Sequence, residues 1–148
     1  MSKLMQIYCC GCGKFNEAEL KTGKDIYPHR DDLKDLPFWQ CSTCGNYIGC
    51  HYKTKNKTKP LGVIPNKEIR EIRKRIHSVI DPIWQSGKYT RREVYGDLSA
   101  RLRKAFHTAE IRTIEEGELA LKAAYELSDK YDASLGSLIK TYFTYREN

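Results

Sequence analysis

The chain has 148 residues, of which 40% are hydrophobic and 30% are charged. This length suits one domain, or one small module joined to a compact partner. The hydrophobic content is too high for a disordered chain, and no apolar run approaches the roughly 20 residues of a membrane helix. The first eight residues lack the charged start and long apolar core of a secretory signal. We therefore expect a cytoplasmic protein without a membrane partner, whose cysteines stay reduced.

Residues 1–52 predict a β-rich module. Short segments of β-favouring residues are bounded by turn residues, and residues 30–37 read as a charged connector or a single helical turn. The expected strands cover residues 4–8, 14–20 and 25–27, while residues 38–40 lead into the second cysteine pair and residues 47–53 carry β-favouring side chains out of it. All six cysteines lie in this part of the chain, whereas the last 98 residues have none. This asymmetry predicts an N-terminal metal module followed by a different kind of domain.

Two CxxCG turns, separated by 28 residues, carry the strongest chemical signal. A gap of two residues lets one tight turn aim two thiolates at the same ion, and the following glycine permits left-handed backbone. Four sulfur ligands at about 2.3 Å suit tetrahedral zinc and leave no open coordination position. We therefore predict a zinc ribbon-like module with one structural Zn²⁺, bound by Cys9, Cys12, Cys41 and Cys44. A disulfide pair or buried free thiols are the alternative readings.

Two cysteines remain outside these turns. Cys10 could replace Cys9 through a Cys-x-Cys spacing, but two matching turns are the simpler choice. The other cysteine, Cys50, is expected to be buried and to pack like a small hydrophobic side chain. It also belongs to a group of polar residues that would form a second metal or acid/base site if they met in space, namely Cys50, His51, His77, Asp81 and His107. No known catalytic motif accompanies this group, so we expect it to be structural and the chain not to be an enzyme.

Residues 53–65 predict a basic and mobile linker, because residues 53–60 (KTKNKTKP) contain no apolar side chain. Residues 66–148 predict a compact bundle of about four helices, which makes the fold class α+β. The first helix begins after Asn66 and carries a stripe of isoleucines, and Asp81-Pro82 is expected to interrupt it. The expected helical core consists of Ile72, Ile76, Val79, Leu98, Leu102, Leu119, Leu127, Leu138 and Ile139.

Further helix starts follow from local signals. The patterns Thr90-x-x-Glu93 and Thr113-x-x-Glu116 are typical of capping boxes, so each predicts a helix start. A last helix is predicted to begin at Asp132. These three starts, with the isoleucine helix, account for the four predicted helices.

Positive charge is concentrated in the middle of the chain. Residues 52–75 contain nine basic and two acidic residues, whereas the rest of the chain is balanced. A basic loop followed by a row of cations on one flank of a helix suits a polyanion, most often nucleic acid. The predicted nucleic-acid-binding residues are Lys53, Lys55, Lys57, Lys59, Arg70, Arg73 and Lys74. An ordinary solvated surface is the alternative interpretation.

The order of these fragments resembles an uncharacterised family of zinc-finger-containing domains found in bacteriophage and prophage proteins. The likeness rests on Cys9-x-x-Cys12, Phe38-Trp39-x-Cys41-x-x-Cys44, Ile48-Gly49-Cys50-His51, Pro60-Leu61-Gly62 and Asp81-Pro82-x-Trp84, and it runs from about residue 8 to 127. The resemblance implies a phage protein acting in the cytoplasm of a bacterial host, and it brings no established activity.

These observations lead to one main hypothesis and two alternatives. The main hypothesis is a phage-encoded zinc protein that binds DNA or RNA through the basic linker and the first long helix. The first alternative is an interaction protein that binds and modulates a host defence or replication protein, or a phage protein. The second alternative is a metal-dependent nuclease.

Overall fold

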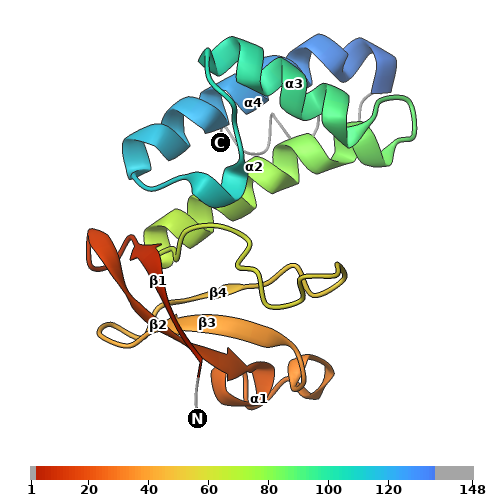
Figure 1. The fold of residues 1–148 in the computed structure, drawn as a ribbon. Helices are drawn as coiled ribbons and strands as arrows, with labels where there is room; N and C mark the ends of the chain where they lie inside the picture. Colours follow the sequence, from red (N-terminus) through yellow and green to blue (C-terminus); the bar gives the residue numbers. More distant parts are fainter. Residues whose placement is uncertain (1–2, 136–148) are drawn as a thin grey trace. The chain divides into compact units, whose positions relative to one another are not determined.

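The computed structural model describes residues 3–135 and shows an α+β protein, as predicted (Figure 1). The chain divides into two compact units between Glu68 and Ile69. We call them the sheet unit and the helical unit. No helix among the described residues has both the length and the hydropathy needed to cross a bilayer.

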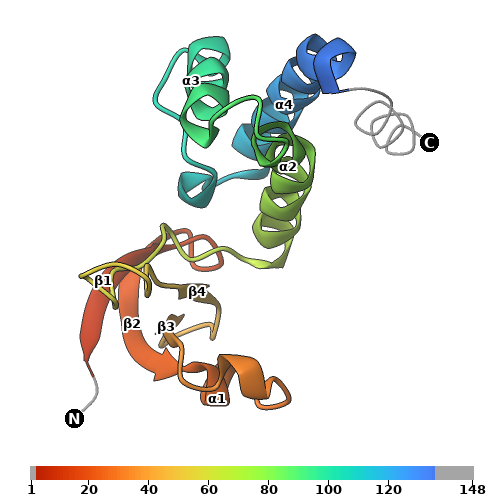
Figure 2. The same cartoon turned by 90° about the vertical axis from the view of Figure 1, so that its right-hand side faces the viewer.

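The sheet unit contains four antiparallel strands in the order β1-β2-β3-β4. The strands are β1 (Leu4–Cys9), β2 (Lys14–Thr22), β3 (Pro37–Cys41) and β4 (Tyr47–Gly49). Between β2 and β3 the chain forms α1 (Gly23–Ile26) and the 3₁₀ turn η1 (Asp31–Leu33). Figure 2 shows β2 as the long curved strand from which α1 follows.

The predicted strand at residues 25–27 is wrong, because this stretch belongs to α1 and its C-terminal cap. The Asp25 carboxylate accepts a hydrogen bond from the backbone N–H of Thr22, and the N–H of Tyr27 donates to the carbonyl of Gly23. These local bonds satisfy backbone hydrogen-bonding groups within one helical turn, so this stretch needs no partner strand. The helical turn expected within residues 30–37 is confirmed as η1.

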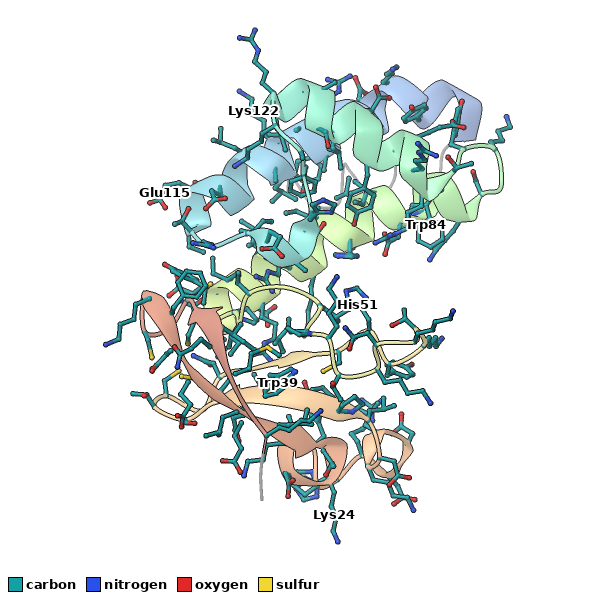
Figure 3. The ribbon with its side chains drawn as sticks, in the orientation of Figure 1. Lys24, Trp39, His51, Trp84, Glu115 and Lys122 are labelled. Atoms are coloured by element: carbon teal, nitrogen blue, oxygen red, sulfur yellow. The ribbon has the colours of Figure 1, made fainter. Side chains whose placement is uncertain are left out.

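One face of the sheet forms the core of this unit. Side chains alternate between the two faces of a strand, and the inward positions are largely apolar. The buried residues are Ile7, Cys9, Ala18, Trp39, Cys41, Ile48, Cys50 and Ile64. Trp39 is 1% exposed and lies among the strands of the sheet unit, whereas Lys24 extends from α1 (Figure 3).

The segment predicted as a linker pairs with both edges of the sheet. Pro60 forms an antiparallel bridge with Cys50 after β4, and Ile64 forms a parallel bridge with Cys9 at the end of β1. The Trp39 indole N–H donates to the carbonyl of Thr58 at 2.6 Å. Residues 58–64 therefore belong to the sheet unit and complete its core.

The helical unit contains three α-helices and one 3₁₀ turn among the described residues. They are α2 (Lys67–Gln85, which begins at the end of the sheet unit), α3 (Arg91–Leu102), η2 (Thr108–Glu110) and α4 (Ile114–Leu135). Figures 1 and 2 show α3 beside α4. Both predicted capping boxes begin helices, because the hydroxyls of Thr90 and Thr113 accept the backbone N–H three residues later.

Several helix details differ from the predictions. The helix α2 continues through Pro82 to Gln85, so Asp81-Pro82 does not end it, although a proline inside a helix removes one backbone N–H donor. Asp132 does not start a helix, because α4 runs through it to Leu135. Leu119 is 62% exposed, since α4 packs through its neighbours Ala120, Ala123, Ala124 and Leu127 instead. The predicted core residues Leu138 and Ile139 lie outside the described residues.

Candidate metal centre

The four predicted ligand cysteines converge in the sheet unit. Their sulfur atoms all lie within 4.8 Å of one another. The Sγ atoms of Cys9 and Cys44 are 3.4 Å apart, and those of Cys12 and Cys41 are 3.7 Å apart. A tetrahedron with zinc–sulfur bonds of about 2.3 Å has sulfur–sulfur edges of about 3.8 Å. The four thiols therefore fit one tetrahedral zinc ion without rearrangement of the backbone.

Each CxxCG motif forms a tight turn that closes on its first cysteine. The N–H of Gly13 donates to the carbonyl of Cys9 at 2.8 Å, and the N–H of Gly45 donates to that of Cys41 at 3.0 Å. The two glycines have φ angles of +70° and +81°, which residues other than glycine rarely adopt. This explains why a glycine follows the second cysteine of each turn.

Two asparagine amides donate hydrogen bonds to the sulfurs. The Nδ2 of Asn16 lies 3.5 Å from the Sγ of Cys12 and 3.6 Å from that of Cys41, and the Nδ2 of Asn46 lies 3.3 Å from the Sγ of Cys44. Four thiolates around one Zn²⁺ carry a net charge of about −2, and amide donors offset it. These two asparagines were not predicted from the sequence as hydrogen-bond donors to the site, although each lies within four residues of a ligand cysteine.

The thiol environments differ in a way that suits metal binding. Burial raises the pKa of the Cys9 thiol. Burial would also raise the pKa of Cys41, but the backbone N–H groups of Cys44 and Thr43 outweigh it and lower this pKa to about 7. Cys41 is thus ready to bind as a thiolate near neutral pH, whereas zinc would displace the proton of Cys9.

The predicted basic residues are found in both units. The side chains of Lys53, Lys55, Lys57 and Lys59 are exposed on the loop of residues 53–60, which we call the lysine loop. On α2, Lys74 is exposed and Arg70 is partly buried. Arg73 is buried rather than on the surface as predicted, because its Nη2 donates to the carbonyl of Ile111 at 2.8 Å.

The second polar group is divided between the two units. In the sheet unit, Cys50 is buried, and burial raises its pKa to about 11. In the helical unit, the Nδ1 of His77 lies 3.3 Å from the Oδ2 of Asp81, whereas His107 is exposed before η2. Asp81 also accepts a hydrogen bond from the indole N–H of Trp84 at 3.1 Å, and the structural role of the pair stays a prediction. Among residues 3–135, the metal-ligand cluster is that of the four cysteines.

A four-thiolate centre formed by two CxxCG turns of an antiparallel sheet defines a zinc-finger protein with one structural Zn²⁺. The chain belongs to the family of zinc-finger-containing domains, whose model matches residues 5–129. No curated protein and no solved structure shows a significant match to the chain.

Proposed function

We propose that this zinc protein binds the phosphate backbone of nucleic acid through the lysine loop, with Arg70 and Lys74 of α2 as further cationic contacts. One observation carries the proposal: four exposed lysines alternate with uncharged residues on a loop that is attached to the sheet at both ends. Within residues 3–135, none of these lysines takes part in an ion pair.

The attachment of the loop makes it a better phosphate ligand than a free chain. The N–H of His51 donates to the carbonyl of Lys59 at 2.9 Å, and the N–H of Thr54 donates to the carbonyl of His51 at 3.1 Å. The first bond holds the two ends of the loop together and the second forms a turn at its start, so less backbone entropy is lost on binding. The zinc centre stabilises the sheet that carries the loop and performs no chemistry on the ligand.

The salt dependence of binding tests this proposal. Each phosphate neutralised on a duplex contributes about 0.9 to the slope of log K against log salt. Replacing all four loop lysines with serine should therefore weaken binding to every sequence and flatten the slope by about 3 to 4. A control variant replaces four exposed lysines elsewhere in the sheet unit and changes the net charge equally: Lys3, Lys14, Lys24 and Lys34. It should keep most of the wild-type affinity and slope.

Two results would redirect the proposal. If neither duplex nor single-stranded nucleic acid binds more tightly than about 100 μM at low salt, weaker than ordinary non-specific binding, the partner is a protein. If Mg²⁺ or Mn²⁺ produces cleavage that His77→Ala abolishes in a folded protein, the protein is a nuclease. Because the sequence resembles phage and prophage proteins, we further propose that binding takes place in the cytoplasm of a bacterial host.

A further inference from the structure

The outward face of the sheet carries a row of side chains that leads to the lysine loop. Strand pairing places Lys21 of β2 opposite Phe38 of β3, and Phe38 opposite Gly49 of β4. The N–H of Leu61 donates to the carbonyl of Gly49 at 3.0 Å, which extends the row by one position. A methyl group on Gly49 would lie 3.5 Å from Leu61 Cδ1 and 3.8 Å from Phe38 Cε1. Leu61 and Phe38 therefore lie side by side on this face.

Two tyrosines extend this row into an aromatic cluster. The ring centroid of Tyr27 lies 5.7 Å from that of Phe38 and 5.4 Å from that of Tyr47, and all three pairs meet edge to face. None of the three rings is fully buried, and Leu61 beside them is 42% exposed. We call these four residues the aromatic face. It is an apolar platform on the outside of the sheet, opposite the core.

Positive charge lies directly beside the aromatic face. His51 follows Gly49 by two residues, just beyond the end of β4. The backbone N–H of His51 donates to the carbonyl of Lys59, so Lys59 lies opposite it in the same extended pairing as Leu61 and Gly49. A ligand on the aromatic face would thus meet Lys59, the last lysine of the lysine loop, two residues before Leu61.

We propose that the aromatic face stacks on unpaired bases, so that the protein prefers single-stranded nucleic acid to duplex. This inference rests on the proposed function, which supplies the phosphate contacts. Aromatic side chains bind the flat faces of bases without regard to sequence, and such stacking combines with a cationic groove in proteins that bind single strands. In a duplex these base faces are covered by their neighbours, so a duplex offers only its phosphates to the loop.

An abasic strand separates the two contributions without altering the protein. The zinc-loaded full chain is titrated with a mixed-sequence single strand of about 20 nucleotides, its duplex, and a single strand of equal length with abasic sites. We expect the abasic strand to bind roughly 5- to 150-fold more weakly than the intact strand, the range for the loss of one stacked base. DNA and RNA versions of each strand show which sugar is preferred.

Variants of the aromatic face provide the second measurement. Tyr47→Leu keeps an apolar side chain but removes the ring, and it should weaken single-strand binding by a similar factor without changing the salt slope. The same variant should bind the abasic strand like wild type. Phe15→Leu is the matched control, because this ring is 60% exposed on β2 but lies six residues from Lys21, about 20 Å along the strand. It should leave every affinity unchanged.

The outcomes distinguish this inference from the proposed function. If intact and abasic strands bind equally while the lysine variant still weakens both, phosphate binding stands and base stacking is wrong. If none of the strands binds, the proposed function itself fails. A wild-type preference for duplex over single strand would also overturn the inference, whether or not Tyr47→Leu folds.

Discussion

Replacing a single zinc ligand should unfold the sheet unit and leave the helical unit intact. Cys41→Ser removes the thiol whose pKa is lowered to about 7 by backbone N–H groups. The buried core of this unit contains four large apolar side chains: Ile7, Trp39, Ile48 and Ile64. Each stabilises the fold by about 1.5–3 kcal/mol. Structural zinc contributes about 10–16 kcal/mol at neutral pH, as much as or more than these four together.

The two tryptophans allow each unit to be followed by itself. Trp39 is buried in the sheet unit, and Trp84 belongs to α2 in the helical unit. In a Trp84→Phe background, Cys41→Ser or zinc chelation should shift the remaining emission to the red as Trp39 becomes exposed. In a Trp39→Phe background the emission should stay unchanged. Far-UV circular dichroism should retain the helical signal in both cases.

The control for this experiment is Cys10→Ser, since Cys10 adjoins a ligand but lies outside the sulfur cluster. It should bind one zinc per chain and keep the emission of Trp39. The reasoning would be refuted if Cys41→Ser kept a full equivalent of zinc and a buried Trp39, or if freshly purified wild type contained less than half an equivalent.

Other predictions concern packing and pH. Gly11→Ala should weaken zinc binding, because its methyl carbon would clash with the side-chain amide of Asn46, which donates to the Cys44 sulfur; competition with a chelator measures this. Tyr131→Phe should destabilise the helical unit by about 1.5–3 kcal/mol at pH 7, since the tyrosine hydroxyl donates to Asp97 and lowers its pKa. The ionised Asp97 stabilises the fold above its unfolded pKa, and this stability disappears as the pH falls through the lower folded pKa; acid unfolding of the variant should show a smaller loss. Leu119→Ser should barely change the melting temperature, whereas Leu127→Ala should cost about 2–5 kcal/mol.

Local patterns predicted the metal centre and the two helix starts with capping boxes, at Thr90 and Thr113, because their chemistry is local. Two cysteines separated by two residues must form one turn, and a threonine three residues before a glutamate caps a helix without distant partners. The convergence of Cys9, Cys12, Cys41 and Cys44 follows once the strands between them pair. The asparagine donors are harder to predict, because Asn16 contacts Cys41 from a different strand.

Predictions failed where a distant segment decides the outcome. Arg73 lies on the flank of an amphipathic helix, where a cation normally faces solvent. A carbonyl 38 residues away, that of Ile111, accepts its hydrogen bond and holds it inside. Leu119 is the larger hydrophobe, but the close packing of α4 uses small alanines, so the exposed position is not evident from hydropathy. The sequence around Arg73 does not indicate its bond to Ile111, and the sequence around Leu119 does not indicate that the neighbouring alanines make the packing contacts.

In the lysine loop, the polar composition and the backbone hydrogen bonds point to different degrees of order. Its side chains are polar, so the sequence reads as a mobile linker, yet the carbonyl of Thr58 accepts the indole N–H of the buried Trp39. Pro60 at the end of the loop pairs with Cys50 beyond β4, and Ile64 in the segment that follows pairs with Cys9 of β1. The charges therefore project from a loop whose ends are part of the core. Any change that loosens the core, including the loss of zinc, should also release the lysines from their arrangement and raise the entropy cost of binding a phosphate backbone.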